Sequence, residues 1–222
     1  MITPPDDKFV SIVGEHYFQP IATLLNELIS RPEPAANDVK TSYHENGFAC
    51  AVCLLVVVCL ESYSMRLRFF NRSAPAAEKR NCLEFLRDLY PEFPTIEQVT
   101  ETFVLRDIIA HNHLWEIGFS WGELSEPMTL QSAAKDAISG DNKYAHHVDA
   151  QTRKTKILHL NAVPLKIDRS DVLKVLKVVW NALLFLESQD RGQCPISHVI
   201  VKYGGEFRRF GEVVRLFANE EE

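Results

Sequence analysis

The feature that most constrains the fold of this chain is a single apolar run. It extends from Phe48 to Leu60 without a charged residue and is closed by Glu61. A helix needs about 20 residues to cross a bilayer, so this run is too short to span a membrane. A helix that is apolar on every side lies at the centre of a packed protein. We therefore expect a buried core helix over about residues 46–70, with a basic second half and no membrane association.

The composition places the chain among globular proteins. Of its 222 residues, 46% are hydrophobic and 24% are charged, proportions that exclude the disordered and fibrous classes. A net charge of -6 argues against coating of nucleic acid by charge alone, although it leaves room for a local basic groove. The N-terminus lacks the basic and apolar regions of a secretory signal. We therefore predict a cytoplasmic protein.

The five cysteines are an odd number, and three of them lie in the apolar run. Cys50 and Cys53 have the Cys-x-x-Cys spacing of redox and zinc sites, but the sequence offers no second pair of ligands at a suitable spacing. We interpret these cysteines as buried free thiols that act as small apolar residues. The sequence therefore predicts neither a metal nor a cofactor.

Helical periodicity along most of the chain predicts a mainly α protein. Besides the core helix we expect four helical stretches: residues 8–30 with a kink or break at Pro20, residues 76–89, a stretch that opens with a capping box at Thr95 and Gln98 and extends as far as Phe119, and a helix that begins at Asp168 or Ser170 and ends near residue 189.

Strand patterns are confined to the second half of the chain. Residues 155–160 and 163–167 predict two short strands with a turn between them. The tail predicts a strand over 197–203, a break at Gly204 and Gly205, and an amphipathic helix over 206–217. We thus expect one helical domain over 1–222, with an N-terminal helical extension over 1–40 and an insertion over 119–168 that is irregular or holds a short β-hairpin.

The adjacent His146 and His147 draw attention as metal ligands. Neighbouring residues point in different directions on a helix or a strand, and no His-x-x-x-His follows nearby. We interpret the pair as part of a solvated loop. A metal-dependent hydrolase is therefore the least favoured of the functions considered.

The stretch from Leu105 to Trp115 carries the most informative polar residues, because Arg106, Asp107 and His111 interrupt an otherwise apolar helix. Asp107 and His111 are four residues apart and share a helix face, so the carboxylate can orient the imidazole and fix its tautomer. Arg106 and His111 are about 140° apart around a helix. They converge on one atom only in a loosened turn or where two copies of the helix meet across a two-fold axis.

Cleavage of RNA by its own 2′-hydroxyl group is a reaction that uses these side chains. A histidine with a pKa near 6.5 can remove the 2′ proton or protonate the leaving oxygen. An arginine can pair with the phosphate through two hydrogen bonds and stabilise charge in the transition state. The alternative is an Arg–Asp–His cluster that only ties helices together.

These residues resemble the signature of the HEPN superfamily (higher eukaryotes and prokaryotes nucleotide-binding). That signature is an Arg, a following Asn, Asp or His, and a His after four to six intervening residues, within a helical bundle. Arg106, Asp107 and His111 match it. The apolar helix that ends in Leu60 and Glu61 is similar to an early helix of the family, whose Glu lies near the motif. The resemblance covers residues 45–118 and 169–189.

The resemblance implies a HEPN-like helical bundle and a metal-independent endoribonuclease that acts as a homodimer, with the motifs of both protomers in one cleft. Many members are toxins of toxin–antitoxin pairs or effectors of anti-phage defence. Arg106 would bind the scissile phosphate, His111 would transfer the proton, Asp107 would order the site, and Glu61 would pair with Arg106 from behind. We also consider a catalytically inactive HEPN-like module that dimerises or binds a partner or RNA.

His113 marks a difference from one subgroup of the family. In that subgroup a Tyr two residues after the motif His is modified by a nucleotidyltransferase antitoxin, whereas this chain has His113 there. We therefore do not expect silencing by that route, and any antitoxin or defence partner stays unidentified. His113 is either a reserve group for proton transfer or a surface or interface histidine.

The substrate contacts that we predict are Asn112, Arg66 and Arg68. Arg66 and Arg68 belong, with Arg72, to one of the two densest basic stretches; the other is Arg153, Lys154 and Lys156 in the insertion. Either stretch can line a groove that binds RNA in an acidic protein. Solvated helix faces and loops have the same composition, and Trp115 and Trp121 can stack on bases or belong to a core.

Overall fold

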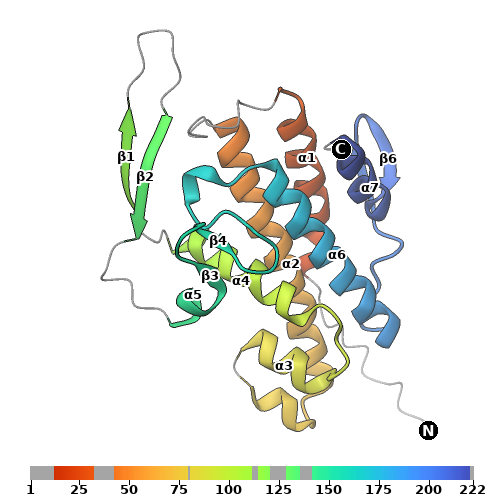
Figure 1. The fold of residues 1–222 in the computed structure, drawn as a ribbon. Coiled ribbons are helices and arrows are strands. Elements are labelled where there is room, and N and C mark those ends of the chain that lie inside the picture. Colours follow the sequence, from red (N-terminus) through yellow and green to blue (C-terminus); the bar gives the residue numbers. More distant parts are fainter. Residues whose placement is uncertain are drawn as a thin grey trace, which may run out of the picture.

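The computed structural model describes residues 13–32, 43–79, 81–111, 115–120, 129–135 and 142–220. The fold is mainly helical, as the periodicity predicts, and its strands form three separate two-stranded antiparallel sheets. Figure 1 shows the helices packed around one central helix, with the sheets at the periphery.

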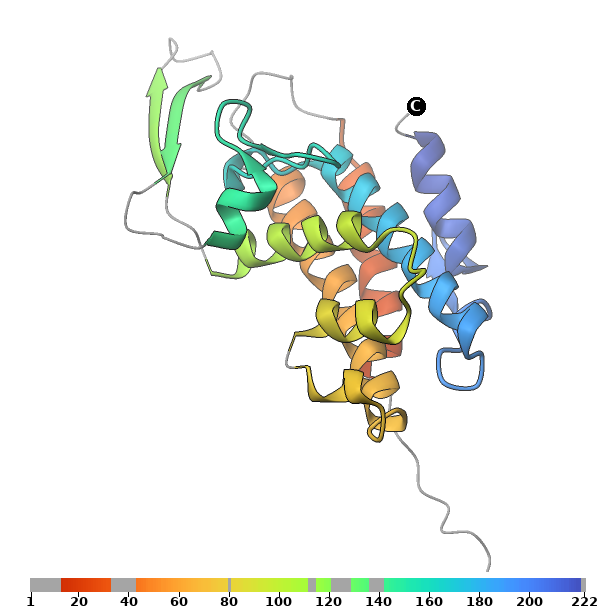
Figure 2. The same ribbon diagram turned by 60° about the horizontal axis from the view of Figure 1, so that its bottom comes forward.

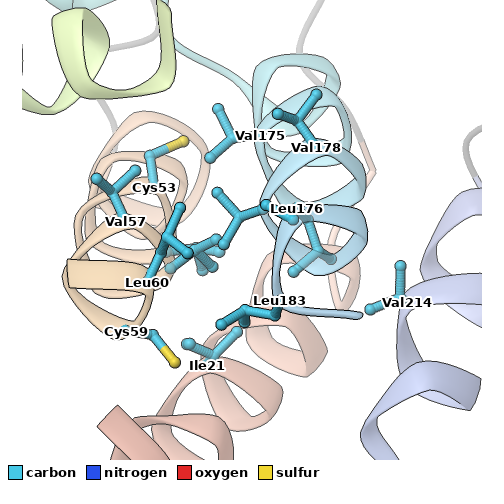
Figure 3. Packing of buried hydrophobic residues seen from close by; sticks show 14 of the residues in the cluster. Ile21, Cys53, Val57, Cys59, Leu60, Val175, Leu176, Val178, Leu183 and Val214 are labelled. Carbon is cyan, nitrogen blue, oxygen red and sulfur yellow. The ribbon is translucent and has the colours of Figure 1, made fainter. Parts of the chain in front are cut away.

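The central helix is α2, Phe48–Phe70, which follows a π-helical turn at Tyr43–Gly47. It packs against α1 (Phe18–Ile29), α4 (Ile96–Ala110) and α6 (Arg169–Gln189). In Figure 3, Leu60 of α2 lies opposite Leu176 and Leu183 of α6, and all three side chains are buried. The prediction of a long helix over about 46–70 whose apolar first half lies at the centre is confirmed.

The segment His44–Phe70 is the one described helix that is long and apolar enough to cross a membrane, judged by length and composition. Half of its most apolar window is buried inside the protein. Because α1, α4 and α6 pack around it, a central place in the core accounts for its apolar sequence.

Pro20 and Asp168 mark the starts of α1 and α6. A 3-10 turn at Val13–Tyr17 precedes α1, and Pro20 lies in the first turn of α1, where a backbone N–H has no helical partner to lose. Pro20 therefore does not break the helix, and the change from 3-10 to α-helix comes two residues earlier, at Phe18. Asp168 caps α6: its carboxylate accepts hydrogen bonds from the backbone N–H groups of Ser170 and Asp171. The carboxylate of Asp171 in turn accepts a hydrogen bond from the backbone N–H of Asp168. The predicted start of α6 is confirmed.

The two helices predicted between α2 and α6 need correction. Residues 76–89 are not one helix: a 3-10 turn at Pro75–Glu78 is followed by α3, Cys82–Leu89, which Asn81 caps by accepting a hydrogen bond from the N–H of Leu83. Thr95 precedes α4 without a side-chain cap, so the predicted capping box does not form.

The extension of the fourth helix to Phe119 is also wrong. α4 ends at Ala110, and β1, Trp115–Ser120, pairs with β2, Thr129–Lys135. The local apolar spacing that favoured a helix here is overridden by pairing with a strand that lies further along the chain. The insertion does contain a β-hairpin, formed by β1 and β2 rather than by residues 155–167.

Residues 142–167 fold differently from the prediction. His146 and His147 end a short helix, α5 (Asn142–His147), instead of lying in a loop. The strands β3 (Val148–Asp149) and β4 (Lys154–Thr155) pair, and Pro164–Lys166 is a 3-10 turn.

The buried Glu101 of α4 explains why no strand follows Thr155. Its carboxylate accepts hydrogen bonds from the backbone N–H groups of Ile157 and Leu158, at 2.9 and 2.7 Å. These donors are therefore not available to a strand ladder. The chain turns through positive φ at Arg153 and His159 on either side of this contact.

The C-terminal region follows the prediction in outline. β5, Ile200–Tyr203, turns at Gly204 and Gly205 into β6, Glu206–Arg209. Both glycines have positive φ, which other residues rarely adopt. The last helix, α7 (Phe210–Glu220), begins four residues later than expected because the chain first completes this hairpin. Figure 2 shows α7 lying along α6, on the side away from α4.

Candidate active site

Arg106 is held by an acidic side chain from another helix. Its Nη2 donates a hydrogen bond of 2.9 Å to Oε1 of Glu61, which lies at the middle of α2. Its guanidinium carbon also lies 5.4 Å from the ring centre of Phe103, one turn earlier on α4. The packing of α4 across α2 thus places the arginine, a supporting carboxylate and an aromatic face together. This is the pair of side chains that the resemblance puts next to each other.

Arg106 keeps donors for a further partner. Its Nε lies 3.2 Å from Oδ1 of Asp107, at an angle that does not make a hydrogen bond, and no described residue accepts a hydrogen bond from its Nη1. The exposed fractions are 23% for Arg106 and 30% for Glu61. A guanidinium has five N–H donors in a planar fork. The site can therefore bind an anion such as a phosphate without breaking the bond to Glu61.

His111 stands exposed at the end of α4. It is the residue that closes the helix, and its backbone N–H donates a 3.0 Å hydrogen bond to the carbonyl oxygen of Asp107. The carboxylate of Asp107 makes an ion pair with Arg106, a contact that the four-residue spacing to His111 does not suggest. The structure thus brings Asp107 to Arg106 through side chains and to His111 through backbone atoms.

Cys82, at the start of α3, lies beside the same group of side chains. Burial raises the pKa of its thiol to about 11, a hydrogen bond to Ser64 opposes this rise, and the nearby charges of Glu61, Arg68 and Arg106 act on it as well. The thiol is therefore protonated at neutral pH and is not a nucleophile. Its neighbours also show that Arg68 and Arg106 lie on one flank of α2.

The two predicted arginines of α2 differ in their contacts. Arg68 donates a hydrogen bond of 3.2 Å to the carbonyl oxygen of Asn81 and lies over the ring of Phe85, so it fastens α3 to α2. Arg66 lies over the exposed ring of Phe70, with 5.3 Å between the guanidinium carbon and the ring centre. Arg68 is thus a packed residue beside the candidate site, and Arg66 belongs to the surface near the end of α2.

The remaining predicted residues lie elsewhere. Asn112, His113 and Trp121 are outside the described residues. Arg153, Lys154 and Lys156 lie in the loop that Glu101 holds on α4, where the ammonium of Lys156 donates to the carbonyl oxygen of His146 at 2.6 Å.

His146 and His147 lie at the edge of an open cleft of about 340 Å³ between α3, α4 and α5. Within the ranges that the structure covers, no three His, Cys, Asp or Glu side chains are placed to hold a metal ion. Of the Cys-x-x-Cys pair, Cys53 is buried as expected and Cys50 is half-buried. Burial raises the pKa of Cys50 to about 12, and the pKa of Cys53 is also well above its ordinary value.

Phe103 and the exposed pair Phe69 and Phe70 were not among the predicted site residues. Phe103 precedes Arg106 by three residues, a spacing that places it one turn away on the same face. Phe69 and Phe70 directly follow Arg68 at the end of a helix whose first half has no exposed residue. Two aromatic residues beside a basic residue at the end of an apolar helix are the sequence signal for this surface.

Comparisons with protein-family models, with curated proteins and with solved structures find no match for this chain.

Proposed function

We propose that this protein is a metal-independent endoribonuclease of the HEPN type, which acts as a homodimer and cleaves RNA through the 2′-hydroxyl group. The observation that carries the proposal is the state of Arg106. Glu61 holds its guanidinium from α2, its Nη1 has no acceptor among the described residues, and an exposed histidine ends the same helix.

Arg106 binds the scissile phosphate. Its open N–H groups donate to the phosphate oxygens, and the charge on these oxygens grows as the phosphorus becomes five-coordinate. Glu61 and Phe103 hold the guanidinium in place, so little side-chain freedom remains to be lost when RNA binds. The carboxylate of Asp107, 3.2 Å from Nε, adds a second negative charge that helps to hold the guanidinium.

His111 moves the proton. Its neutral imidazole removes the proton of the 2′-hydroxyl, and the 2′ oxygen attacks the phosphorus. The bond from phosphorus to the 5′ oxygen breaks, that oxygen takes a proton from a second histidine, and a 2′,3′-cyclic phosphate remains. A two-fold arrangement of two chains supplies the second histidine and a second Arg106, which overcomes the separation of Arg106 and His111 around one helix.

A nuclease that needs no metal and acts on RNA of its own cell must be controlled. A role as a toxin or as an anti-phage effector, with an antitoxin or another partner of the same defence system, fits such an enzyme. This biological role rests on the resemblance and is part of the proposal.

The test compares wild type with Arg106→Ala and His111→Ala on total RNA in excess chelator. We expect cleavage by wild type, and a loss of at least about 100-fold in each variant. Arg87→Ala is the matched control, because Arg87 makes an exposed 2.7 Å ion pair with Glu97 on the neighbouring helices. Intact RNA in every sample of folded dimeric protein would favour the inactive module that dimerises or binds a partner.

A further inference from the structure

The C-terminal end of α2 exposes an unusual group of side chains. Met65, Phe69 and Phe70 are 54%, 49% and 42% exposed, although no residue in the first half of the same helix is exposed. Figures 1 and 2 show this end of α2 reaching the edge of the molecule beside α3. We call Met65, Arg66, Phe69, Phe70 and Arg72 the α2 patch.

Arginines stack on the exposed rings of the α2 patch. The guanidinium carbon of Arg66 lies 5.3 Å from the ring centre of Phe70, and that of Arg72 lies 5.4 Å from the ring centre of Phe69. The two rings meet edge to face, with their centres 5.5 Å apart. Flat aromatic faces beside cationic forks are the groups that bind unpaired bases and the phosphates between them.

The α2 patch is continuous with the candidate active site. Glu61, Met65 and Phe69 follow one another at four-residue spacing, so they share one face of α2. The rise of a helix puts Phe69 about 12 Å beyond Glu61 along the axis. Arg68, between them, is one of the charges that act on Cys82 together with Glu61 and Arg106. A strand that lies along this face therefore leads toward Arg106.

We infer that the α2 patch binds single-stranded RNA, with unpaired bases stacked on Phe69 and Phe70 and phosphates paired with Arg66 and Arg72. This inference rests on the proposed function and names its substrate class. Bases inside a duplex keep their faces covered, so rings of this kind cannot stack on them. The α2 patch thus selects unpaired segments and guides the next phosphate to Arg106.

Charge argues against a second copy of this chain as the occupant. Residues 62–73 contain three arginines and no acidic residue. Two such patches facing each other across a two-fold axis would set arginines against arginines, which is unfavourable. RNA supplies the complementary charge.

The experiment measures binding without cleavage. His111→Ala protein is titrated into a labelled single-stranded RNA of roughly 12 nucleotides and into the same sequence as a duplex, with fluorescence anisotropy as the readout. Adding Phe69→Ala and Phe70→Ala should weaken single-strand binding at least about tenfold. Adding Phe207→Ala, which removes an 80% exposed ring on β6, should leave it within about twofold.

Salt dependence separates the phosphate contacts from stacking. Replacing Arg72 with Ala should lower the slope of log affinity against log salt by about one. The double Phe variant should keep the slope and lose affinity at every salt concentration.

Several results would overturn the inference. One is that the double Phe variant binds the single strand as tightly as the His111→Ala parent, and another is that Phe207→Ala loses as much affinity as the double Phe variant. The others are tighter binding of the duplex than of the single strand, and a change of the double Phe variant from dimer to monomer in sedimentation. The two proposals can fail separately. If RNA binds through the α2 patch but wild type cleaves no RNA, the nuclease proposal fails and the α2 patch proposal stands. If wild type cleaves RNA but the double Phe variant binds it as tightly as the His111→Ala parent, the nuclease proposal stands and the α2 patch proposal fails.

Discussion

Two arginine–glutamate pairs of the same chemistry lie in very different surroundings in this protein. Arg169 and Glu45 are 8% and 2% exposed, and Nη2 of Arg169 lies 2.7 Å from Oε2 of Glu45. The same guanidinium nitrogen also donates to the carbonyl oxygens of Leu28 and Arg31. Arg106 and Glu61 are 23% and 30% exposed and share one hydrogen bond.

The difference separates a structural pair from a candidate functional one. Arg169 donates its hydrogen bonds to groups inside the protein, and these bonds join the start of α6 to the end of α1 and to the turn before α2. Arg106 is fixed by Glu61, and among the described residues nothing accepts a hydrogen bond from its Nη1. A buried charge that is fully paired supports the fold, whereas a positioned charge with open donors can meet a ligand.

The largest effect on stability is expected at the buried pair of Arg169 and Glu45. Arg169→Ala leaves the carboxylate of Glu45 buried without its partner, so the free energy of unfolding should fall by about 3–5 kcal/mol. Denaturation by urea measures this directly. A loss below about 1 kcal/mol would show that the pair does not hold α1, α2 and α6 together.

Arg106→Ala should reduce RNA cleavage strongly and stability only slightly. Because the pair is partly solvated, the free energy of unfolding should fall by less than about 1 kcal/mol, while RNA cleavage falls about 100- to 1,000-fold. Unfolding curves and cleavage rates from the same preparations measure both effects. If Arg106→Ala were as destabilising as Arg169→Ala, both ion pairs would be structural, and Arg106 would lose its distinction as a candidate functional residue.

Asp171, two residues after Arg169, makes the free energy of unfolding depend on pH. Burial, with the nearby charge of Asp168, raises the pKa of Asp171 to about 6 from its ordinary 3.8. The folded protein therefore binds this proton more readily than the unfolded chain, and its stability rises as the pH falls through 6 toward 4. The change is of the order of 2–3 kcal/mol.

Asp171→Asn isolates this contribution. The difference in free energy of unfolding between wild type and variant should shift in favour of wild type as the pH falls from 7.5 to 4.5. Parallel profiles for the two proteins would contradict the raised pKa.

The smallest effect is expected at a third pair, which is more exposed still. Arg87 and Glu97 are 51% and 57% exposed, and water screens their attraction. Arg87→Ala should change the free energy of unfolding by about 0.5 kcal/mol or less. A larger loss in urea denaturation would mean that distance, rather than exposure, sets the strength of these pairs.

The elements that the sequence predicted are those with strong local signals. The apolar run of α2 can only be buried, and Asp168 with Asp171 forms a capping box within three residues of the start of α6. The pairing of Arg106 with Glu61 was expected from the resemblance alone, since helical spacing within one segment cannot show which side chain of a distant helix faces an arginine.

The failures came from partners that lie far along the chain. Trp115–Ser120 is a strand because residues 129–135 pair with it, and residues 157–158 leave the strand pattern because Glu101 takes their N–H groups. Asp107 was expected to orient His111, and its ion pair with Arg106 is a further contact that was not expected. Local spacing does not contain this information.

The most direct test of the nuclease proposal is the chemistry of the cleaved ends. Purified wild type and His111→Ala are incubated with a defined RNA in excess chelator, and with the same RNA carrying a 2′-deoxy sugar at the cleaved position. We predict fragments with 2′,3′-cyclic phosphates from wild type only, and no cleavage at the deoxy position. Cleavage at that position, or equal cleavage by His111→Ala, would contradict the assignment of the reaction to the 2′-hydroxyl group and His111.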